Sequence, residues 1–449
     1  MRYFLHAFAV TAVLFQLLGS PVHGAPQGTP PNLLVLVADD LGVDMLACYG
    51  EGLDLPATPV IDGLAASGLK FRNCWANPIC TPTRATLQTG RYGFRTGMGY
   101  LIGGGGPDLQ HSELILPEVL SSQTFPSWSC AMIGKWHLGA HSDPSHANAA
   151  GYAHFSGALG NFHYPQSFYN WTKVVNGNVS TSTTYATVDT VNEALAWIAT
   201  APEPWMCFVA FNAPHEPFHI PPAGMFSVEL PDVDPREIPR PFYKAAIEVM
   251  DTEIGRLLAG LPPSGGPPNI IFLGDNGTPR EVCAPPFTPE HAKLTMYEGG
   301  LGVPLIITGP GVPTGGATCN ALINTSDLFA TTIELCSATL PSALAPDDSV
   351  SLVPYLSQPQ RPSLRRFVFA ELFRPNGPVP HAKRKRAVRG KRYKLIRRGR
   401  EAVNDELYDL LVDRYEEQDL LALPQGALSP LAWRALEQLR AELDRLDGA

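Results

Sequence analysis

The sequence predicts an α/β fold in which helices flank a large mixed, mostly parallel sheet, followed by a smaller C-terminal antiparallel sheet with one helix. Three observations predict it: apolar runs of strand length, helical patterns between these runs, and shorter strand-like segments after about residue 360. The chain has 449 residues, of which 45% are hydrophobic and 17% charged. This composition allows a large core and argues against global disorder.

Several apolar runs end abruptly in polar side chains. The runs cover residues 33–38, 130–134, 206–211 and 270–274. Near-continuous hydrophobicity is typical of parallel strands that are covered on both faces. Ligands of such sheets bind beyond the carboxyl ends of the strands. We therefore expect one site to be formed by the polar residues that follow these runs: Asp39, Asp40, Lys135, His137, His215, Asp275 and Asn276.

Helical spacing of apolar residues predicts helices over residues 187–200 and 243–258. In the C-terminal region, residues 367–370, 386–389 and 393–396 are expected to be short, exposed strands. Residues 429–446 are expected to be an amphipathic helix with Ser429 as its N-cap. The predicted organisation is a signal peptide (1–24), a catalytic domain (25–358) and a C-terminal subdomain (359–449).

The N-terminal residues predict export. Arg2 precedes an apolar run to Leu18, and small residues surround Gly24. An uncleaved anchor is the alternative, but no later stretch is apolar enough to span a bilayer. The expected location is secreted, periplasmic or the lumen of a compartment such as the lysosome, with no membrane attachment after signal removal. Eight cysteines fit an oxidising compartment, with Cys319 and Cys336 as candidates for a bridge.

The net charge of −9 argues against a nucleic-acid partner. Basic residues nevertheless crowd one C-terminal stretch, where a solvated strand face is favoured over contact with a polyanionic substrate. The stretch comprises Lys383, Arg384, Lys385, Arg386, Arg389, Lys391, Arg392, Lys394, Arg397, Arg398 and Arg400.

The segment from Cys80 to Arg91 is the most informative part of the sequence. Pro82 suits a first helical turn and Gly90 a helix end. Cys80 is then expected at a helix N-terminus, where N–H groups and the dipole favour an anion. Arg84 adds a positive charge suited to a tetrahedral oxyanion.

The pattern Cys80-x-Pro-x-Arg followed by Thr89-Gly90 closely resembles the signature of the type I sulfatases, in the alkaline phosphatase superfamily. Thr83 stands where that signature usually has Ser or Ala. Further motifs of the family occur in order at residues 31–42, 134–139, 213–217, 274–277, 293–304 and 407–416. The resemblance implies that a formylglycine-generating enzyme oxidises Cys80 to formylglycine, the nucleophile.

Asp39, Asp40, Asp275 and Asn276 offer only oxygen ligands, which predicts a Ca²⁺ site, with Mg²⁺ as the less favoured occupant. The resemblance assigns Arg84, Lys135, His137, His215 and Lys293 to the sulfate and the leaving group. Asp275 would act as a base, His215 or Lys293 would protonate the leaving alcohol, and His137 would accept a proton when sulfate is released.

The expected activity is hydrolysis of an aryl or carbohydrate sulfate ester, on a small molecule or a glycan. A phosphonate or phosphate ester hydrolase on the same scaffold is the first alternative. A non-catalytic binder of sulfated polymers is the second, and it is disfavoured because every matched catalytic position is filled.

Overall fold

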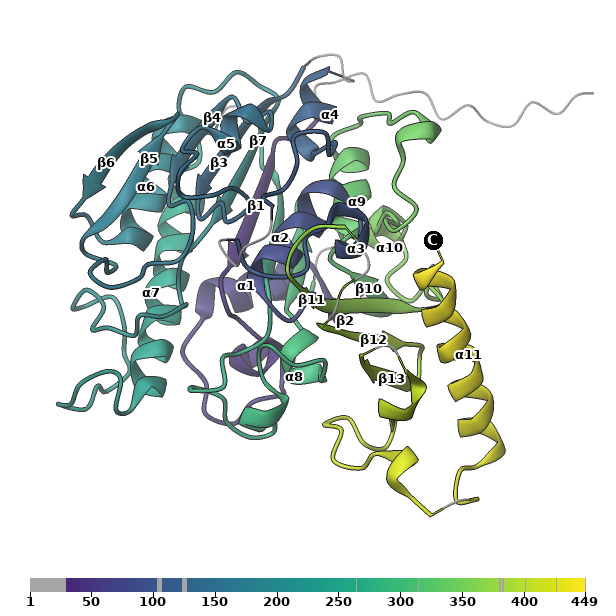
Figure 1. Ribbon diagram of the computed structural model, residues 1–449. Helices are drawn as coiled ribbons and strands as arrows, with labels where there is room; N and C mark the ends of the chain where they lie inside the picture. The colour runs from purple at the N-terminus through teal and green to yellow at the C-terminus, as the bar shows by residue number, and fades with distance from the viewer. Residues whose placement is uncertain are drawn as a thin grey trace, which may run out of the picture.

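The computed structural model describes residues 30–102, 107–122, 127–263, 265–313, 315–378, 381, 383–399, 401–424 and 426–448. The predicted signal peptide and Arg400 lie outside these residues. Two sheets organise the described chain, a large one with helices on both faces and a small one beside a long C-terminal helix (Figure 1). No helix within the described ranges is both long and apolar enough to cross a membrane.

In the described residues the large sheet has ten strands, in the order β10-β2-β9-β8-β1-β7-β3-β4-β5-β6. Neighbours from β8 to β4 are parallel, as are β10 and β2, and the remaining pairs are antiparallel. The strands are β1 (Leu33–Ala38), β2 (Leu69–Trp75), β3 (Ser129–Gly134), β4 (His154–Gly157), β5 (Trp171–Val175), β6 (Asn178–Ser182), β7 (Trp205–Ala210), β8 (Asn269–Gly274), β9 (Leu305–Thr308) and β10 (Ala317–Asn324).

The described helices are α1 (Pro59–Ser67), α2 (Cys80–Thr89), α3 (Gly93–Thr96), α4 (Leu116–Ser122), α5 (His146–Ala149), α6 (Ala186–Ile198), α7 (Pro239–Ala259), α8 (Glu298–Leu301), α9 (Asp327–Leu335), α10 (Val353–Ser357) and α11 (Pro430–Asp447).

Side chains alternate along a strand, so successive residues of β1 enter different cores. Leu34 and Leu36 pack with α1, α6 and α7. Val35 and Val37 lie in the other core, with α2, α4, α9 and α10. Burial on both faces explains why β1 lacks polar alternation.

The small sheet is antiparallel, in the order β11-β12-β13-β14. Its strands are β11 (Val368–Arg374), β12 (Lys383–Arg389), β13 (Tyr393–Arg398) and β14 (Asp405–Asp409). One face packs against Leu436, Leu439 and Leu443 of α11, which runs alongside the sheet (Figure 1). The Ser429 side chain accepts a hydrogen bond from the Ala432 N–H at 3.2 Å, as its predicted N-cap role requires. The predicted fold class is confirmed.

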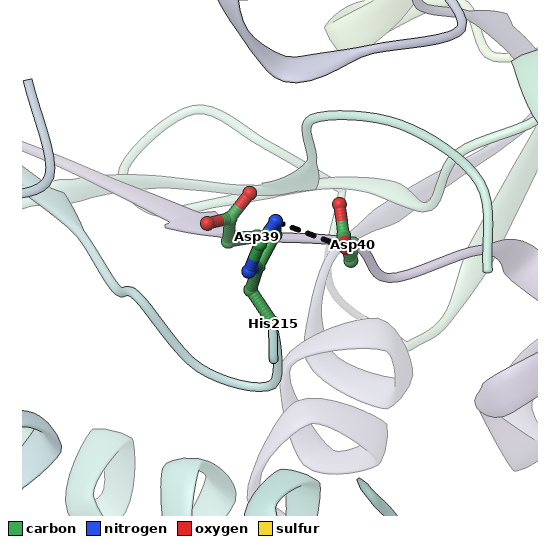
Figure 2. Close-up of side chains that lie close together, drawn as sticks. All are labelled: Asp39, Asp40 and His215. Carbon is green, nitrogen blue, oxygen red and sulfur yellow. Dashed lines mark ion pairs between the residues drawn. The ribbon is translucent and has the colours of Figure 1, made fainter. Parts of the chain in front are cut away.

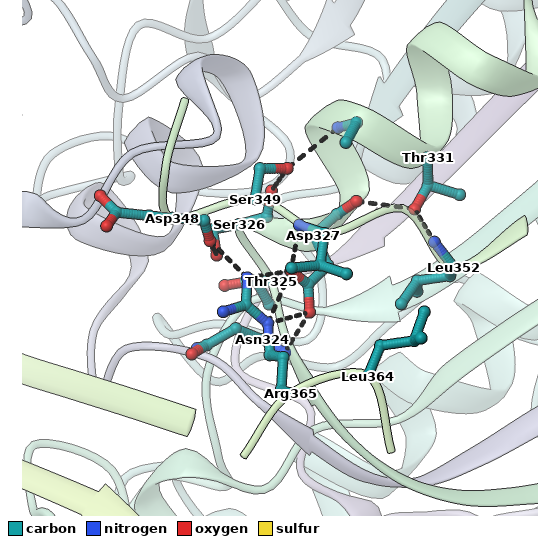
Figure 3. A network of polar contacts seen from close by, with 12 residues as sticks. Asn324, Thr325, Ser326, Asp327, Thr331, Asp348, Ser349, Leu352, Leu364 and Arg365 are labelled. Atoms are coloured by element: carbon teal, nitrogen blue, oxygen red, sulfur yellow. Dashed lines mark hydrogen bonds and ion pairs between the residues drawn. The ribbon is translucent and has the colours of Figure 1, made fainter. Parts of the chain in front are cut away.

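A buried polar network joins the start of the C-terminal region to α9, one of the helices that cover the large sheet (Figure 3). The guanidinium Nε of Arg365 donates to both carboxylate oxygens of Asp327, the first residue of α9, at 2.8 Å. The same carboxylate accepts from the backbone N–H groups of Asn324 and Val350, at 2.9 and 2.8 Å. These contacts fix the chain shortly after the predicted domain boundary at residue 358, which itself stays a prediction.

The predicted solvated face of the basic stretch is wrong for four of its described residues. Carboxylates from neighbouring elements pair with four buried members of the stretch, which are Arg386, Arg389, Lys394 and Arg397. The strands of this subdomain are therefore largely covered rather than exposed. Cys319 and Cys336 are also not bridged, since all eight cysteines carry free thiols.

Lys394 forms the most buried of these ion pairs. Its ammonium lies 2.6 Å from a carboxylate oxygen of Glu416 and 3.2 Å from one of Glu298, the first residue of α8. It also sits over the Trp75 ring, 4.7 Å from the centroid. The cluster therefore ties the small sheet to the segment that follows the candidate site residue Lys293.

We expect Lys394→Met to lower the free energy of unfolding by about 3–5 kcal/mol, because the buried Glu416 carboxylate loses its cation. Urea titration followed by tryptophan fluorescence measures this loss. Lys391→Met is the matched control: Lys391 is exposed, so its removal should change stability by about 0.5 kcal/mol or less. Equal stability of the two variants would contradict the assigned role.

Candidate active site

The site lies where neighbouring parallel strands of the large sheet end. Asp39 and Asp40 follow β1, and His215 lies on the loop after β7. Figure 2 shows His215 approaching both aspartates, with its Nε2 at 3.6 Å from an Asp40 carboxylate oxygen. Lys135 follows β3 and Asp275 follows β8, so these side chains meet although they are far apart in sequence. The expected convergence at the strand ends is therefore observed.

The acidic and amide side chains contact one another directly. The Asn276 amide nitrogen donates to Asp40 Oδ1 at 2.8 Å, and the Asp40 backbone N–H donates to Asp275 Oδ1 at 3.0 Å. Asp40 has a positive φ of 68°, a region that favours Gly, Asn and Asp. This turn directs the two consecutive aspartates into one buried cluster.

Three cations neutralise this cluster. Arg84 donates from Nη2 and Nε to Asp275 Oδ2, at 2.8 and 3.0 Å. Lys135 pairs with Asp39 and Lys293 pairs with Asp40. Burial alone would raise the pKa of Asp40, but the charge of Lys293, and to a smaller extent that of Lys135, lowers it to about 2. Arg84 and Lys135 are buried together with these carboxylates, whereas Lys293 is partly exposed.

Cys80 is the first residue of α2, as predicted, and it is fully buried. Its sulfur, one carboxylate oxygen of Asp39 and one of Asp275 all lie within 4.8 Å of one another. Burial raises the pKa of the Cys80 thiol to about 11, although Lys135 acts in the opposite direction. The encoded thiol is therefore protonated at neutral pH and is a poor nucleophile.

The helix that carries Cys80 is fixed by its own side chains. The Thr83 hydroxyl accepts from the Asn77 N–H at 2.9 Å and lies 3.3 Å from the carbonyl oxygens of Asn77 and Ile79. Gly90 ends the helix with a φ of 69°. Thr83, the departure from the usual signature, thus holds the loop that leads into Cys80.

Two histidines face the same cluster. His215 Nδ1 lies 2.7 Å from the Glu216 carbonyl oxygen, which orients Nε2 towards Asp40. Burial lowers the pKa of His215 to about 4, against the pull of Asp40. Burial and the charges of Lys135 and Arg84 hold the pKa of His137 well below its ordinary value. Both imidazoles are therefore neutral at pH 7, and a bound anion would make protonation easier.

The donor set fits a hard divalent cation. Asp39 Oδ1 and Asn276 Oδ1 are buried and accept no hydrogen bond from the described residues. Burial and the charge of Asp39 raise the pKa of Asp275 to about 6, despite Arg84. A cation would satisfy the two free oxygens and relieve the repulsion between carboxylates.

Two further residues shape the site without having been predicted to do so. The Tyr243 hydroxyl donates to the Asp40 carbonyl oxygen at 2.6 Å. Gly134 has a φ of 94°, and a Cβ there would lie 2.0 Å from the Ala210 carbonyl oxygen, so only glycine allows the turn into Lys135. The sequence indicated only a helix at Tyr243, because no local pattern marks a contact between residues so far apart in the chain.

Comparison with known proteins agrees with this geometry. The family model described as sulfatase matches residues 31–338, and the model described as N-sulphoglucosamine sulphohydrolase, C-terminal, matches residues 290–442. The chain is 32% identical to N-acetylgalactosamine-6-sulfatase of Homo sapiens over 380 residues, which are 76% of this chain and 68% of that protein. It is 26% identical to arylsulfatase G of Mus musculus over 399 residues, covering 76% and 72% of the two chains.

Solved structures share the fold. The crystal structure of Ps i-CgsB in complex with k-i-k-neocarrahexaose superposes with a TM-score of 0.77 at 22% identity, covering 93% of this chain and 92% of that one. The structure of BT4656 in complex with D-glucosamine-2-N,6-O-disulfate superposes with a TM-score of 0.72 at 19% identity, covering 94% and 98%. The family match over most of the chain and the relatives together show that this protein is an enzyme of the sulfatase family, a sulfuric ester hydrolase.

Proposed function

We propose that the enzyme removes sulfate from a carbohydrate sulfate ester, using formylglycine made from Cys80 and a bound Ca²⁺. The observation that carries this proposal is the position of Cys80, buried at the start of α2 between Asp39 and Asp275. A protonated thiol at position 80 is a poor nucleophile, whereas formylglycine, its oxidation product, can form a hydrate that attacks sulfur. The hydrated aldehyde supplies one hydroxyl to attack sulfur and a second through which sulfate can later be expelled.

Ca²⁺ is the proposed cation, and Asp39, Asp40, Asp275 and Asn276 would hold it. The two free oxygens of Asp39 and Asn276 support this assignment, because Ca²⁺ takes several oxygen ligands in flexible geometry. Mg²⁺ is the less favoured occupant, since it demands near-octahedral geometry and keeps several waters. When bound, the cation would lower the pKa of a hydroxyl at position 80 and offset charge on the sulfate.

The remaining residues have roles that follow from where their charges lie. Asp275 is the proposed base, because one of its carboxylate oxygens lies within 4.8 Å of the Cys80 sulfur. Arg84 and Lys135 are fixed donors near Cys80 and would bind sulfate oxygens as negative charge develops. Asp40 holds the pKa of Lys293 above its ordinary value against the effect of burial, so Lys293 is protonated and positively charged when the substrate binds.

Proton transfer to the leaving alcohol is assigned to His215 or Lys293, the two cationic or protonatable groups beside Asp40. His137 would take the proton from the second hydroxyl during sulfate release. Its Nδ1 is buried without a hydrogen-bond partner among the described residues. A neutral imidazole with a free ring nitrogen can accept a proton at that step.

A carbohydrate sulfate is the preferred substrate class because of the relatives. N-acetylgalactosamine-6-sulfatase is named for a sulfated sugar, and BT4656 is described with the sulfated sugar that is its substrate. We also infer export by the signal peptide over residues 1–24 and maturation by a formylglycine-generating enzyme. Export would place the protein outside the cytoplasm or in a lumen, where such glycans occur.

We expect the purified enzyme, produced with a formylglycine-generating system, to hydrolyse an aryl sulfate and at least one sulfated sugar from a defined panel. Release of inorganic sulfate, measured by ion chromatography, reports the activity. A matched aryl phosphonate ester tests the alternative chemistry, and its kcat/KM should be at least about 100-fold lower, a difference of roughly 2.7 kcal/mol. Faster phosphonate cleavage would favour the alternative, and binding without any turnover would favour a non-catalytic role.

A further inference from the structure

A basic pocket lies at one end of the small sheet. It has a volume of about 500 Å³, within the range of small-molecule sites. The described residues that line it include no aspartate or glutamate. We call it the basic pocket, and it is lined by Tyr100, Leu294, Leu372, Phe373, Arg374, Lys383, Arg384, Lys385, Arg398 and Gly399.

Strand register explains why the cations gather there. Arg374 of β11 pairs with Lys383 of β12, and Leu372 pairs with Lys385, which in turn pairs with Arg398 of β13. Because side chains alternate, these residues share one face of the small sheet. Farther along the strands, the same face packs on the catalytic domain through Ala370, Ala387 and Ile396. The end of the small sheet that carries these cations therefore lies beyond the part of the sheet that packs against the rest of the protein.

Three of these cations lack an acidic partner. Arg384 pairs with Glu371 and Asp447, and Arg398 pairs with Glu406. Within the described chain, no carboxylate pairs with Arg374, Lys383 or Lys385. Partial burial lowers the pKa of Lys385, and the positive charges of Arg398 and Arg374 lower it further. This excess of positive charge distinguishes the pocket from the rest of the basic stretch, which is largely neutralised.

The pocket adjoins the reaction centre through Leu294. Leu294 directly follows Lys293, whose ammonium pairs with Asp40. The backbone N–H of Leu294 donates a hydrogen bond, at 2.9 Å, to the carbonyl oxygen of Pro78, which lies two residues before Cys80. One wall of the basic pocket is thus the segment that supplies Lys293. A substrate extending from Cys80 past Leu294 would reach these cations.

We propose that the basic pocket binds an anionic group, a sulfate or carboxylate, on a sugar neighbouring the one whose sulfate ester is cleaved. The inference rests on the proposed function and narrows its substrate to a polyanionic oligosaccharide. Lys383, Lys385 and Arg374 pair with the anion, while Leu294, Leu372 and the Tyr100 ring contact the sugar. A lone sulfated monosaccharide or aryl sulfate cannot occupy both places.

The test compares wild type with the double variant Lys383→Gln/Lys385→Gln. Hydrolysis of an aryl sulfate is the reporter, and three competitors are used: N-acetylgalactosamine 6-sulfate, a chondroitin 6-sulfate tetrasaccharide, and its desulfated, carboxyl-reduced counterpart. We expect the charged tetrasaccharide to inhibit wild type most strongly. In the double variant, the inhibition constant of the charged tetrasaccharide should be about tenfold higher, the effect of losing two partly exposed ion pairs. The inhibition constant of N-acetylgalactosamine 6-sulfate should be unchanged.

Arg366→Gln/Lys391→Gln is the matched control, since it removes the same charge from another part of the subdomain. Added salt should weaken inhibition by the charged tetrasaccharide in wild type and in this control, and less in the double variant. Equal inhibition constants in all three proteins would overturn the proposal, as would equal binding of the charged and neutral tetrasaccharides. Failure of wild type to hydrolyse any sulfate ester would instead contradict the proposed function.

Discussion

Replacing Cys80 by alanine is expected to lower kcat by at least about 10⁴-fold, because loss of a covalent nucleophile leaves only binding and electrostatic effects. The side chain is buried among Asp39, Asp275 and the N-terminus of α2, the place from which the proposed nucleophile acts. Steady-state hydrolysis of an aryl sulfate measures the loss. Cys80→Ser should be active only where the converting system accepts serine.

The same prediction has a direct chemical readout. In active wild-type enzyme, the peptide containing position 80 should be about 18 Da lighter than its cysteine form, the change expected for conversion to an aldehyde. Cys74→Ala is the matched control: Cys74 is buried on β2, six positions earlier, and packs in the core. Its replacement should lower stability slightly and leave activity intact. Full activity with an unmodified thiol at Cys80 would contradict the assignment.

Strand ends were predictable because their signal is local. The run before Asp39 is apolar on both faces, since β1 lies between two helical layers, and the two aspartates mark its end. The run before Asp275 has the same form. The rule that ligands bind beyond the carboxyl ends of parallel strands then brings together residues more than two hundred positions apart.

The C-terminal subdomain was harder to predict because pairing across the fold decides burial there. Lys394 and Arg397 resemble surface residues in a basic sequence, yet both are buried and pair with Glu416 and Asp405, respectively. Nothing near Lys394 in sequence indicates these partners. Tyr243 shows the same limit at the site, since its hydrogen bond to Asp40 depends on how α7 packs against β1. Local patterns place the strands, whereas the packing of separate elements determines which side chains stay accessible.

Asp40→Asn is expected to lower Ca²⁺ affinity at least about 100-fold, because the change removes a carboxylate from the proposed ligand set while keeping its shape. Elemental analysis of the desalted protein measures bound calcium. The thermal midpoint supplies a second readout: Ca²⁺ should raise it in wild type and a chelator should lower it. The variant should show neither response at the same concentrations.

Activity alone cannot identify Asp40 as a ligand, because its carboxylate also pairs with Lys293 and lies near His215. Lys293→Met separates these roles: it removes the cation but leaves all four proposed ligands, so it should keep calcium and lose turnover. Asp44→Asn is the matched control for the charge change, since Asp44 is buried nearby and accepts from Thr278 at 2.7 Å. It should keep both calcium and activity. Stoichiometric calcium in Asp40→Asn would exclude Asp40 as an essential ligand, whereas calcium loss in Lys293→Met would show that the ammonium helps to organise the ligands.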